Sequence, residues 1–158
     1  MIKIICIGKI KEDYLKDGIN EYLKRLSRYT RIEIIELKDI PLKDNMSEIE
    51  EEKAKEEESS LIESRLKDSD YLIALDRMGK ELSSIELSKK IDNTLSSVNK
   101  DIVFMIGGSL GLSKELINKS DLVISFSKLT FPHQLFRLIL LEQIYRSFKI
   151  MKNETYHK

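Results

Sequence analysis

Residues 102–133, IVFMIGGSLGLSKELINKSDLVISFSKLTFPH, contain two short apolar runs, at 102–106 and 122–126. Neither run alternates apolar with polar residues, and continuous apolar runs are typical of parallel strands that helices cover on both faces. The charged segment 113–119 between them begins at a serine and has the length of a short helix. This β–α–β order predicts an α/β fold built on a parallel sheet.

The alternation of strand and helix patterns continues through the rest of the chain. Further strands are predicted at residues 2–8, 31–37 and 70–75, and further helices at residues 12–29, 47–66, 83–95 and 133–151. Ser47 and Ser83 each precede a glutamate by three residues, which is a capping-box signature of a helix start. Residues 76–80 are predicted as the turn after the third strand, and the charged helix at 47–66 is expected at the edge because its apolar positions are few. We expect one domain over residues 1–158, with a mostly parallel sheet of five to six strands flanked by helices.

The last predicted helix, residues 133–151, is apolar on almost every side rather than along one stripe. Its apolar residues include Leu135, Phe136, Leu138, Ile139, Leu140, Leu141, Ile144, Tyr145, Phe148, Ile150 and Met151. A helix that lies on one sheet needs a single apolar stripe, so the surplus requires another cover. We expect a second copy of the chain to supply it, which would form a homodimer through this C-terminal helix.

Charge is distributed unevenly along a chain whose formal net charge is zero. Residues 45–63 hold eight Glu and two Lys, a local balance of −6, whereas residues 128–158 hold six Lys or Arg and two Glu, a balance of +4. The two regions are expected to carry opposite electrostatic fields, although the glutamate run also fits the solvated face of an ordinary helix. A polyanion is therefore able to dock on one face despite the neutral total.

Cysteine content and hydropathy limit the environment of the protein. The one cysteine, Cys6, lies in an apolar run and is predicted to pack as a small hydrophobe rather than act as a nucleophile. No stretch reaches the ~20 consecutive apolar residues that a membrane span needs, and the N-terminus lacks the pattern of a signal peptide. We expect a cytoplasmic protein with no membrane contact. His, Cys and carboxylate residues show no metal-binding spacing, so no metal site is predicted.

Three predicted strand ends mark the candidate ligand site. In an open parallel sheet the ligand lies beyond the carboxyl ends of the strands, which here are Leu75-Asp76, Gly107-Gly108 and residues 125–132. The chain has neither a P-loop motif nor the glycine fingerprint of dinucleotide-binding folds, so a ligand is not expected to be held by its phosphates. The two glycines allow close approach by a flat adenine ring or a ribose, although a tight turn alone also explains them.

Both histidines of the chain lie where a chemical role and a structural role compete. His133 begins the last helix, where the macrodipole disfavours the imidazolium and a neutral imidazole serves as a cap or as a catalytic group. His157 belongs to the terminal tripeptide Tyr156-His157-Lys158, which has no packing reason to be ordered and is interpreted as either a frayed end or a functional tail. No Ser-His-Asp or Cys-His arrangement is evident.

The residues that carry chemistry also match a known pattern. They are Leu75-Asp76, Gly79-Lys80, residues 106–108, Gly111-Leu112, residues 127–133, Arg137, Glu142, Tyr145-Arg146 and residues 156–158. In this order and spacing the chain resembles the RlmH family, which are bacterial large-subunit ribosomal RNA methyltransferases of the SPOUT class. The likeness runs essentially end to end and is most specific in the second half. The resemblance implies an α/β fold with a C-terminal trefoil knot, a homodimer, and S-adenosylmethionine as the methyl donor, without a metal.

The resemblance also implies a substrate and roles for individual residues. The family methylates N3 of a pseudouridine in a stem-loop of 23S ribosomal RNA within the assembled ribosome. The implied donor contacts are Leu75, Asp76, Gly107, Gly108, Ser127, Lys128, Leu129, Thr130, Phe131 and Pro132. The implied catalytic tail lies at the partner subunit's donor site, with His157 as the acceptor of the N3 proton and Tyr156 positioning the base. Lys158 and Arg137 or Arg146 would hold phosphate or stabilise charge on the pyrimidine.

Two alternatives to this function stay open at the level of sequence. Another knotted methyltransferase, acting on transfer RNA or on a different ribosomal nucleotide, would share the donor site and differ in the residues that face the RNA. A non-catalytic nucleotide-binding module associated with the ribosome would keep the sheet and the dimer helix but would need no methyl donor. Binding of the donor separates the second alternative from the enzymes.

Overall fold

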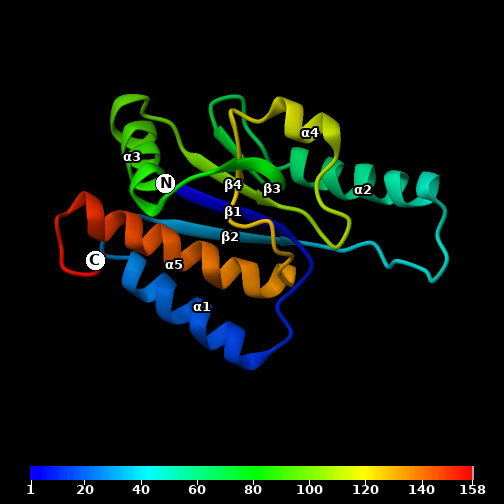
Figure 1. The fold of residues 1–158 in the computed structure, drawn as a ribbon, viewed down its shortest axis with the longest axis horizontal. Helices are drawn as coiled ribbons and strands as arrows, with labels where there is room; N and C mark the ends of the chain where they lie inside the picture. The colour runs from blue at the N-terminus through cyan, green and yellow to red at the C-terminus, as the bar shows by residue number, and fades with distance from the viewer. Residues whose placement is uncertain (158) are drawn as a thin grey trace.

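The computed structural model describes residues 1–157 and shows a parallel sheet between two layers of helices (Figure 1). In chain order the elements are β1 (Ile2–Ile7), α1 (Asp13–Leu26), β2 (Ile32–Leu37), α2 (Glu48–Glu63), β3 (Tyr71–Glu81), α3 (Ser84–Asp92), the π-helical turn η1 (Asn93–Ser97), β4 (Ile102–Ile106), α4 (Lys114–Lys119), β5 (Leu122–Ser125) and α5 (His133–Met151). The five strands lie in the order β2-β1-β4-β3-β5, and every neighbouring pair is parallel. The predicted α/β class and the strand–helix alternation are confirmed, with five strands.

Two apolar cores cover the two faces of the sheet. In β1, alternate residues face opposite sides, so Ile4 and Cys6 belong to one core while Ile5 and Ile7 belong to the other. The first core also receives side chains from α1, α3 and α5, and the second receives them from α2 and α4. Burial raises the pKa of the Cys6 thiol to about 11, so this side chain stays neutral and packs as the predicted small hydrophobe.

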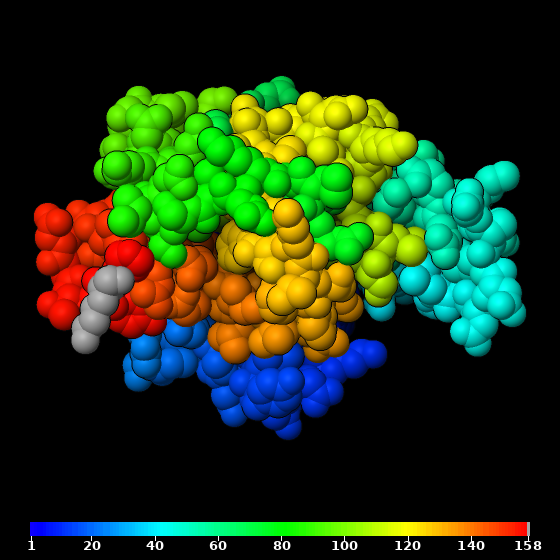
Figure 2. Space-filling model, viewed as in Figure 1, coloured from blue at the N-terminus to red at the C-terminus, as the bar shows by residue number. Residues whose placement is uncertain are grey.

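Serine side chains start three of the helices as their sequences predict. Ser47 accepts a hydrogen bond from the Glu50 amide and Ser83 accepts one from the Glu86 amide, and each glutamate returns the contact to complete a capping box. Ser113 caps α4 in the simpler one-sided way. Helix α2 buries few residues and projects at one end of the molecule, opposite the C-terminal end of α5 (Figure 2), as expected for an edge helix.

The predicted turn at residues 76–80 is wrong as a strand boundary, because β3 continues to Glu81. Its pairing with β5 jumps, so that Ile124 lies opposite Leu75 and again opposite Lys80. The intervening residues leave the ladder as an excursion within the strand. A Cβ on Gly79 would lie 2.6 Å from the backbone of Ile124, so only glycine lets β5 approach this closely.

None of the described helices is long and apolar enough to cross a membrane. The sheet order places β5 at the edge beside β3, and the chain leaves it through residues 126–132 to enter α5. The trefoil knot that the family resemblance implies stays a prediction.

Candidate functional site

A pocket of about 710 Å³ opens at the carboxyl ends of β3, β4 and β5. It is lined by residues 75–78 of the β3 excursion, residues 106–111, residues 124–133 apart from Lys128, and Phe136. The three strand ends that the sequence singles out therefore meet at one pocket. Lys128 belongs to the predicted contact set by sequence, but its side chain does not line this pocket.

Glycines 107, 108 and 111 form a tight turn that leaves no room for a side chain at Gly107. The Gly111 amide donates to the Gly108 carbonyl over 3.1 Å, and a Cβ on Gly107 would lie 2.4 Å from the carbonyl carbon of Gly111. Gly111 has a φ of +81°, which favours glycine, although a Cβ there would meet nothing within 4 Å. Steric closure at Gly107 and backbone conformation at Gly111 are thus two separate reasons for glycine in this turn.

Hydroxyl groups hold the segment between β5 and α5 in shape. The Ser125 hydroxyl donates to the Ser127 carbonyl over 3.0 Å, and the Leu129 amide donates to the Ser127 hydroxyl over 3.0 Å. Arg77 of the β3 excursion donates to the Thr130 hydroxyl over 3.3 Å. Phe131 and Phe126 both pack against the ring of Phe136, which gives the pocket an apolar wall beside these hydroxyl groups.

Glu58 is a buried carboxylate beneath the glycine turn that the sequence analysis does not single out. The residue is 4% exposed; its Oε1 accepts from the Ile40 amide over 3.0 Å, and its Oε2 has no partner among residues 1–157. Burial raises the pKa of this carboxyl. Its Oε2 lies 2.7 Å from the position of a Cβ on Gly108. The four-residue spacing of Ala54, Glu58 and Ile62 marks the buried stripe of α2, and this signal was available in the sequence.

Arg137 does not lie where a phosphate or a substrate base is able to reach it, which corrects its predicted role. The side chain is fully buried and pairs with Glu36 over 2.7 Å. Its second terminal nitrogen donates to the carbonyl oxygens of Ile7 and Gly8 over 2.8 and 2.6 Å. Arg137 therefore fastens α5 to the end of β1, and its charge is already used inside the protein.

His133 lies at the start of α5 and lines the pocket. Burial and, to a smaller extent, the nearby Arg137 charge lower the pKa of its imidazole. This direction agrees with the neutral imidazole that the helix position predicts. A neutral ring beside the pocket is able to donate or accept one hydrogen bond.

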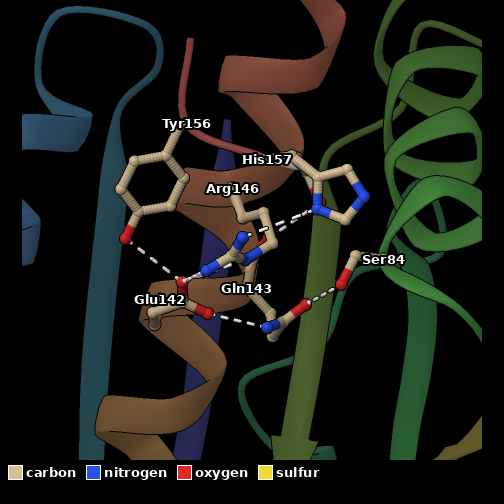
Figure 3. Close-up of polar contacts among 7 residues, drawn as sticks. Ser84, Glu142, Gln143, Arg146, Tyr156 and His157 are labelled. Atoms are coloured by element: carbon tan, nitrogen blue, oxygen red, sulfur yellow. Dashed lines mark hydrogen bonds and ion pairs between the residues drawn. The ribbon is translucent and has the colours of Figure 1, made fainter.

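Tyr156 and His157 lie against the C-terminal half of α5 (Figure 3), an arrangement that favours a packed tail over a frayed end. The Tyr156 hydroxyl donates to Glu142 over 3.2 Å, and the Arg146 guanidinium lies 4.7 Å from the centroid of the Tyr156 ring. Arg146 also approaches Nδ1 of His157 at 3.5 Å and pairs with Glu142 over 2.6 Å. Burial raises the pKa of the Tyr156 phenol, which stays protonated. Lys158 lies outside the described residues.

The tail lies beside the C-terminal half of α5, whereas the pocket lies at the N-terminal end of this helix. The helix has 19 residues, which at 1.5 Å per residue spans roughly 28 Å. Figure 1 shows the C-terminus near one end of α5 and the segment from β5 at the other. The Tyr156 hydroxyl contacts Glu142, nine residues after His133, so it lies roughly 14 Å along the helix from the end that lines the pocket.

Comparison with known proteins identifies the family. Residues 1–157 match the family model described as predicted SPOUT methyltransferase. The ribosomal RNA large subunit methyltransferase H 1 of Clostridium perfringens (strain SM101 / Type A) is 56% identical over 157 residues, which cover 99% of each chain. The ribosomal RNA large subunit methyltransferase H of Acetivibrio thermocellus is 53% identical over the same coverage.

A solved structure agrees with this assignment at the level of the fold. The structure of a probable methylase family protein from Haemophilus influenzae Rd KW20 superposes with a TM-score of 0.55 at 11% identity, over 99% of this chain and 70% of that one. Sequence relatives over the full length, a family model and a shared fold lead to the same conclusion. The chain belongs to the SPOUT methyltransferase family, in the group formed by the ribosomal RNA large subunit methyltransferases H.

Proposed function

We propose that this protein methylates N3 of a pseudouridine in 23S ribosomal RNA of the assembled ribosome, with S-adenosylmethionine as donor. The observation that carries the proposal is the pocket at three strand ends in a chain whose relatives, over 99% of its length, are named ribosomal RNA large subunit methyltransferase H. The family resemblance supplies the nucleotide and the atom. The same proposal places residues 1–158 in one knotted domain that acts in the cytoplasm.

The pocket suits an adenosyl group better than a phosphate chain. Its glycine turn exposes backbone, and its wall carries the rings of Phe126, Phe131 and Phe136 beside the hydroxyls of Ser127 and Thr130. Apolar walls with a few placed polar groups are typical of small-molecule sites. We assign donor contacts to Leu75, Asp76, Gly107, Gly108 and residues 127–132, with Lys128 contributing through its backbone.

The chemistry requires alignment and removal of one proton. When bound, the sulfonium of S-adenosylmethionine supplies an activated methyl group, so the protein mainly positions the acceptor nitrogen. In our proposal His157 accepts the N3 proton and Tyr156, held by Glu142, orients the edge of the base. Lys158, which lies outside the described residues, and Arg146 contribute positive charge toward the RNA.

A second copy of the chain is needed to bring the tail to the pocket. Tyr156 and His157 contact Glu142 and Arg146, which lie roughly 14–20 Å along α5 from the end that lines their own pocket. Apolar side chains at the pocket rim are exposed, with Met78 at 92% and Leu129 at 70%. Large exposed apolar residues beside a ligand site favour a protein interface there. We therefore propose a homodimer through α5 in which each tail completes the partner's pocket.

One experiment tests the whole proposal. Ribosomes from a strain that lacks this gene are incubated with the protein and isotopically labelled S-adenosylmethionine, and the modified nucleotide is identified by mass spectrometry. Label at N3 of a 23S pseudouridine is the expected result. Label on transfer RNA or on another ribosomal nucleotide would show that the proposed substrate is wrong. The absence of both donor binding and label would favour the non-catalytic module.

A further inference from the structure

The C-terminal ends of α1 and α5 lie side by side and bring three tyrosine rings together (Figure 1). The ring of Tyr145 lies 5.9 Å from that of Tyr22 and 6.2 Å from that of Tyr29, both nearly edge to face. The guanidinium of Arg25 lies 5.5 Å from the centroid of Tyr22 and 5.8 Å from that of Tyr145. We call these residues, with the lysines and arginines around them, the tyrosine–arginine surface.

Three exposed cations at the C-terminal ends of α1 and α5 make no ion pair within residues 1–157: Lys24 in the last turn of α1, Arg28 just after it, and Lys152 directly after α5. Nearby, Arg25 pairs with Glu21, and Lys149 pairs with Glu154. Glu154 also accepts a hydrogen bond from the Tyr29 hydroxyl over 2.8 Å, and the positive charge of Arg28 is among the smaller causes that lower the pKa of Glu154. The acidic groups of the surface are therefore already satisfied, and Lys24, Arg28 and Lys152 provide an excess of positive charge.

The tyrosine–arginine surface is continuous with the tail. Tyr145 meets the ring of Tyr156 at a centroid distance of 5.0 Å, edge to face, and the Arg146 guanidinium lies over the same ring. The acidic helix α2 lies at the opposite end of the molecule (Figure 2). Positive charge, aromatic rings and the proposed catalytic residues therefore lie at the same end of the folded molecule.

We propose that the tyrosine–arginine surface binds the sugar-phosphate backbone of the RNA strand next to the methylated base. The inference deepens the proposed function, on which it rests. Cations outside ion pairs release counterions when they neutralise phosphates, and arginine and tyrosine planes stack on unpaired bases. The surface adjoins the tail, so RNA that reaches Tyr156 and His157 extends directly over it.

Charge reversal at the three exposed cations tests this surface. Lys24→Glu, Arg28→Glu and Lys152→Glu are made singly and together, and binding to ribosomes that lack the modification is measured at several salt concentrations. Each substitution is expected to lower the slope of log affinity against log salt by about 1, and the triple variant to weaken binding by at least about tenfold. Affinity for S-adenosylmethionine, measured by calorimetry, stays at the wild-type value.

Matched variants separate a specific contact from a general change in charge. Lys53→Glu, an exposed site on α2, makes the same charge change on the acidic end and is expected to leave ribosome binding unchanged. Lys24→Arg, Arg28→Lys and Lys152→Arg keep the charge and are expected to retain binding. Circular dichroism checks that each variant is folded.

The readouts distinguish failure of the surface from failure of the proposed function. A triple variant with wild-type affinity and salt slope, or a Lys53→Glu variant that loses as much binding, overturns the inference about the surface. A wild-type protein that binds ribosomes without transferring methyl refutes the proposed activity, and the variant comparison still decides whether this surface contacts the RNA.

Discussion

The two ends of helix α5 are built by different means. At its N-terminal end, backbone topology makes the pocket: three strand ends meet, glycines remove side chains, and the charge of Arg137 is buried inside the protein. At its C-terminal end, side chains make the structure, as Glu142, Arg146 and Tyr156 hold one another at the surface. The pocket end therefore depends on the fold as a whole, whereas the tail end should tolerate change without unfolding.

Substitution in the tail should have the largest effect on catalysis. His157→Ala is expected to lower methyl transfer by about 10²–10⁴-fold, the usual contribution of a general base. Donor affinity should stay unchanged because His157 does not line the pocket of its own chain. Single-turnover rates on ribosomes and calorimetry with S-adenosylmethionine measure the two quantities. An unchanged rate would remove His157 from the mechanism.

Mixed dimers show which subunit's tail serves which pocket. One chain carries Gly108→Val, which places side-chain atoms against Glu58, and the other carries His157→Ala. If the tail acts on the partner's pocket, each mixed dimer keeps one intact site and regains about half of the wild-type rate. Two inactive parents that stay inactive after mixing would assign each tail to its own chain.

The two arginine pairs of α5 should differ strongly in stability. Arg137→Leu leaves Glu36 and two backbone carbonyls without their partner and is expected to cost about 3–5 kcal/mol of unfolding free energy. Arg146→Leu removes a partly exposed pair and is expected to cost about 1 kcal/mol or less. Urea unfolding of both variants measures the difference. Equal losses would contradict the contrast between the two ends.

Within the pocket, two glycines should respond for different reasons. Gly107→Ala places a Cβ 2.4 Å from the Gly111 backbone, so the turn must shift and donor binding should fall sharply. A Cβ on Gly111 meets no atom within 4 Å, and asparagine tolerates positive φ, so Gly111→Asn should cost about 1 kcal/mol or less. Donor titration and thermal unfolding compare the two. A milder effect at Gly107 than at Gly111 would mean that the turn is not sterically closed.

The smallest expected effect is a pH dependence at the pocket end. The folded pKa of His133 is lowered, so below its ordinary value of 6.5 the unfolded chain binds a proton that the folded chain does not. The contribution of His133 to the free energy of unfolding is therefore fully present above pH 6.5 and declines as the pH falls toward the folded pKa. His133→Asn should make the decline shallower in urea unfolding at a series of pH values. An NMR titration of the His133 ring that shows an ordinary or raised pKa would exclude this cause.

Sequence patterns predicted the pocket end well because each signal there is local or follows from sheet geometry. The strand Ile102–Ile106 and the helix His133–Met151 have the bounds that their apolar runs indicate, and parallel strands place their carboxyl ends at one edge. Capping boxes at Ser47 and Ser83 depend only on residues three apart, and both are present. Predictions of this kind need no knowledge of long-range contacts.

Features that depend on contacts between distant residues were missed. Pairing of Lys80 with Ile124 extends β3 past its expected turn, and no local pattern encodes that pairing. From sequence alone Arg137 is interpreted as a functional cation, because its contacts with Glu36 and with the end of β1 are visible only in the structure. Tyr156 is held by Glu142, which lies 14 residues earlier in the chain, and no local sequence pattern indicates that contact. Burial and partner choice are set by tertiary structure, so residue type alone misassigns these roles.

The acidic helix α2 and the cationic C-terminal end of α5 lie at opposite ends of the molecule (Figure 2), so this protein has a permanent dipole moment although its formal net charge is zero. The field of a polyanion applies a torque to this dipole and turns the positive end toward the polyanion before contact, whereas the net pull on a body without net charge comes only from the field gradient and is weaker. Encounters should consequently be oriented without being strongly attractive, and the association rate should depend on ionic strength despite a formal net charge of zero. A protein with this charge distribution is expected to bind weakly at most positions on a highly charged particle such as the ribosome.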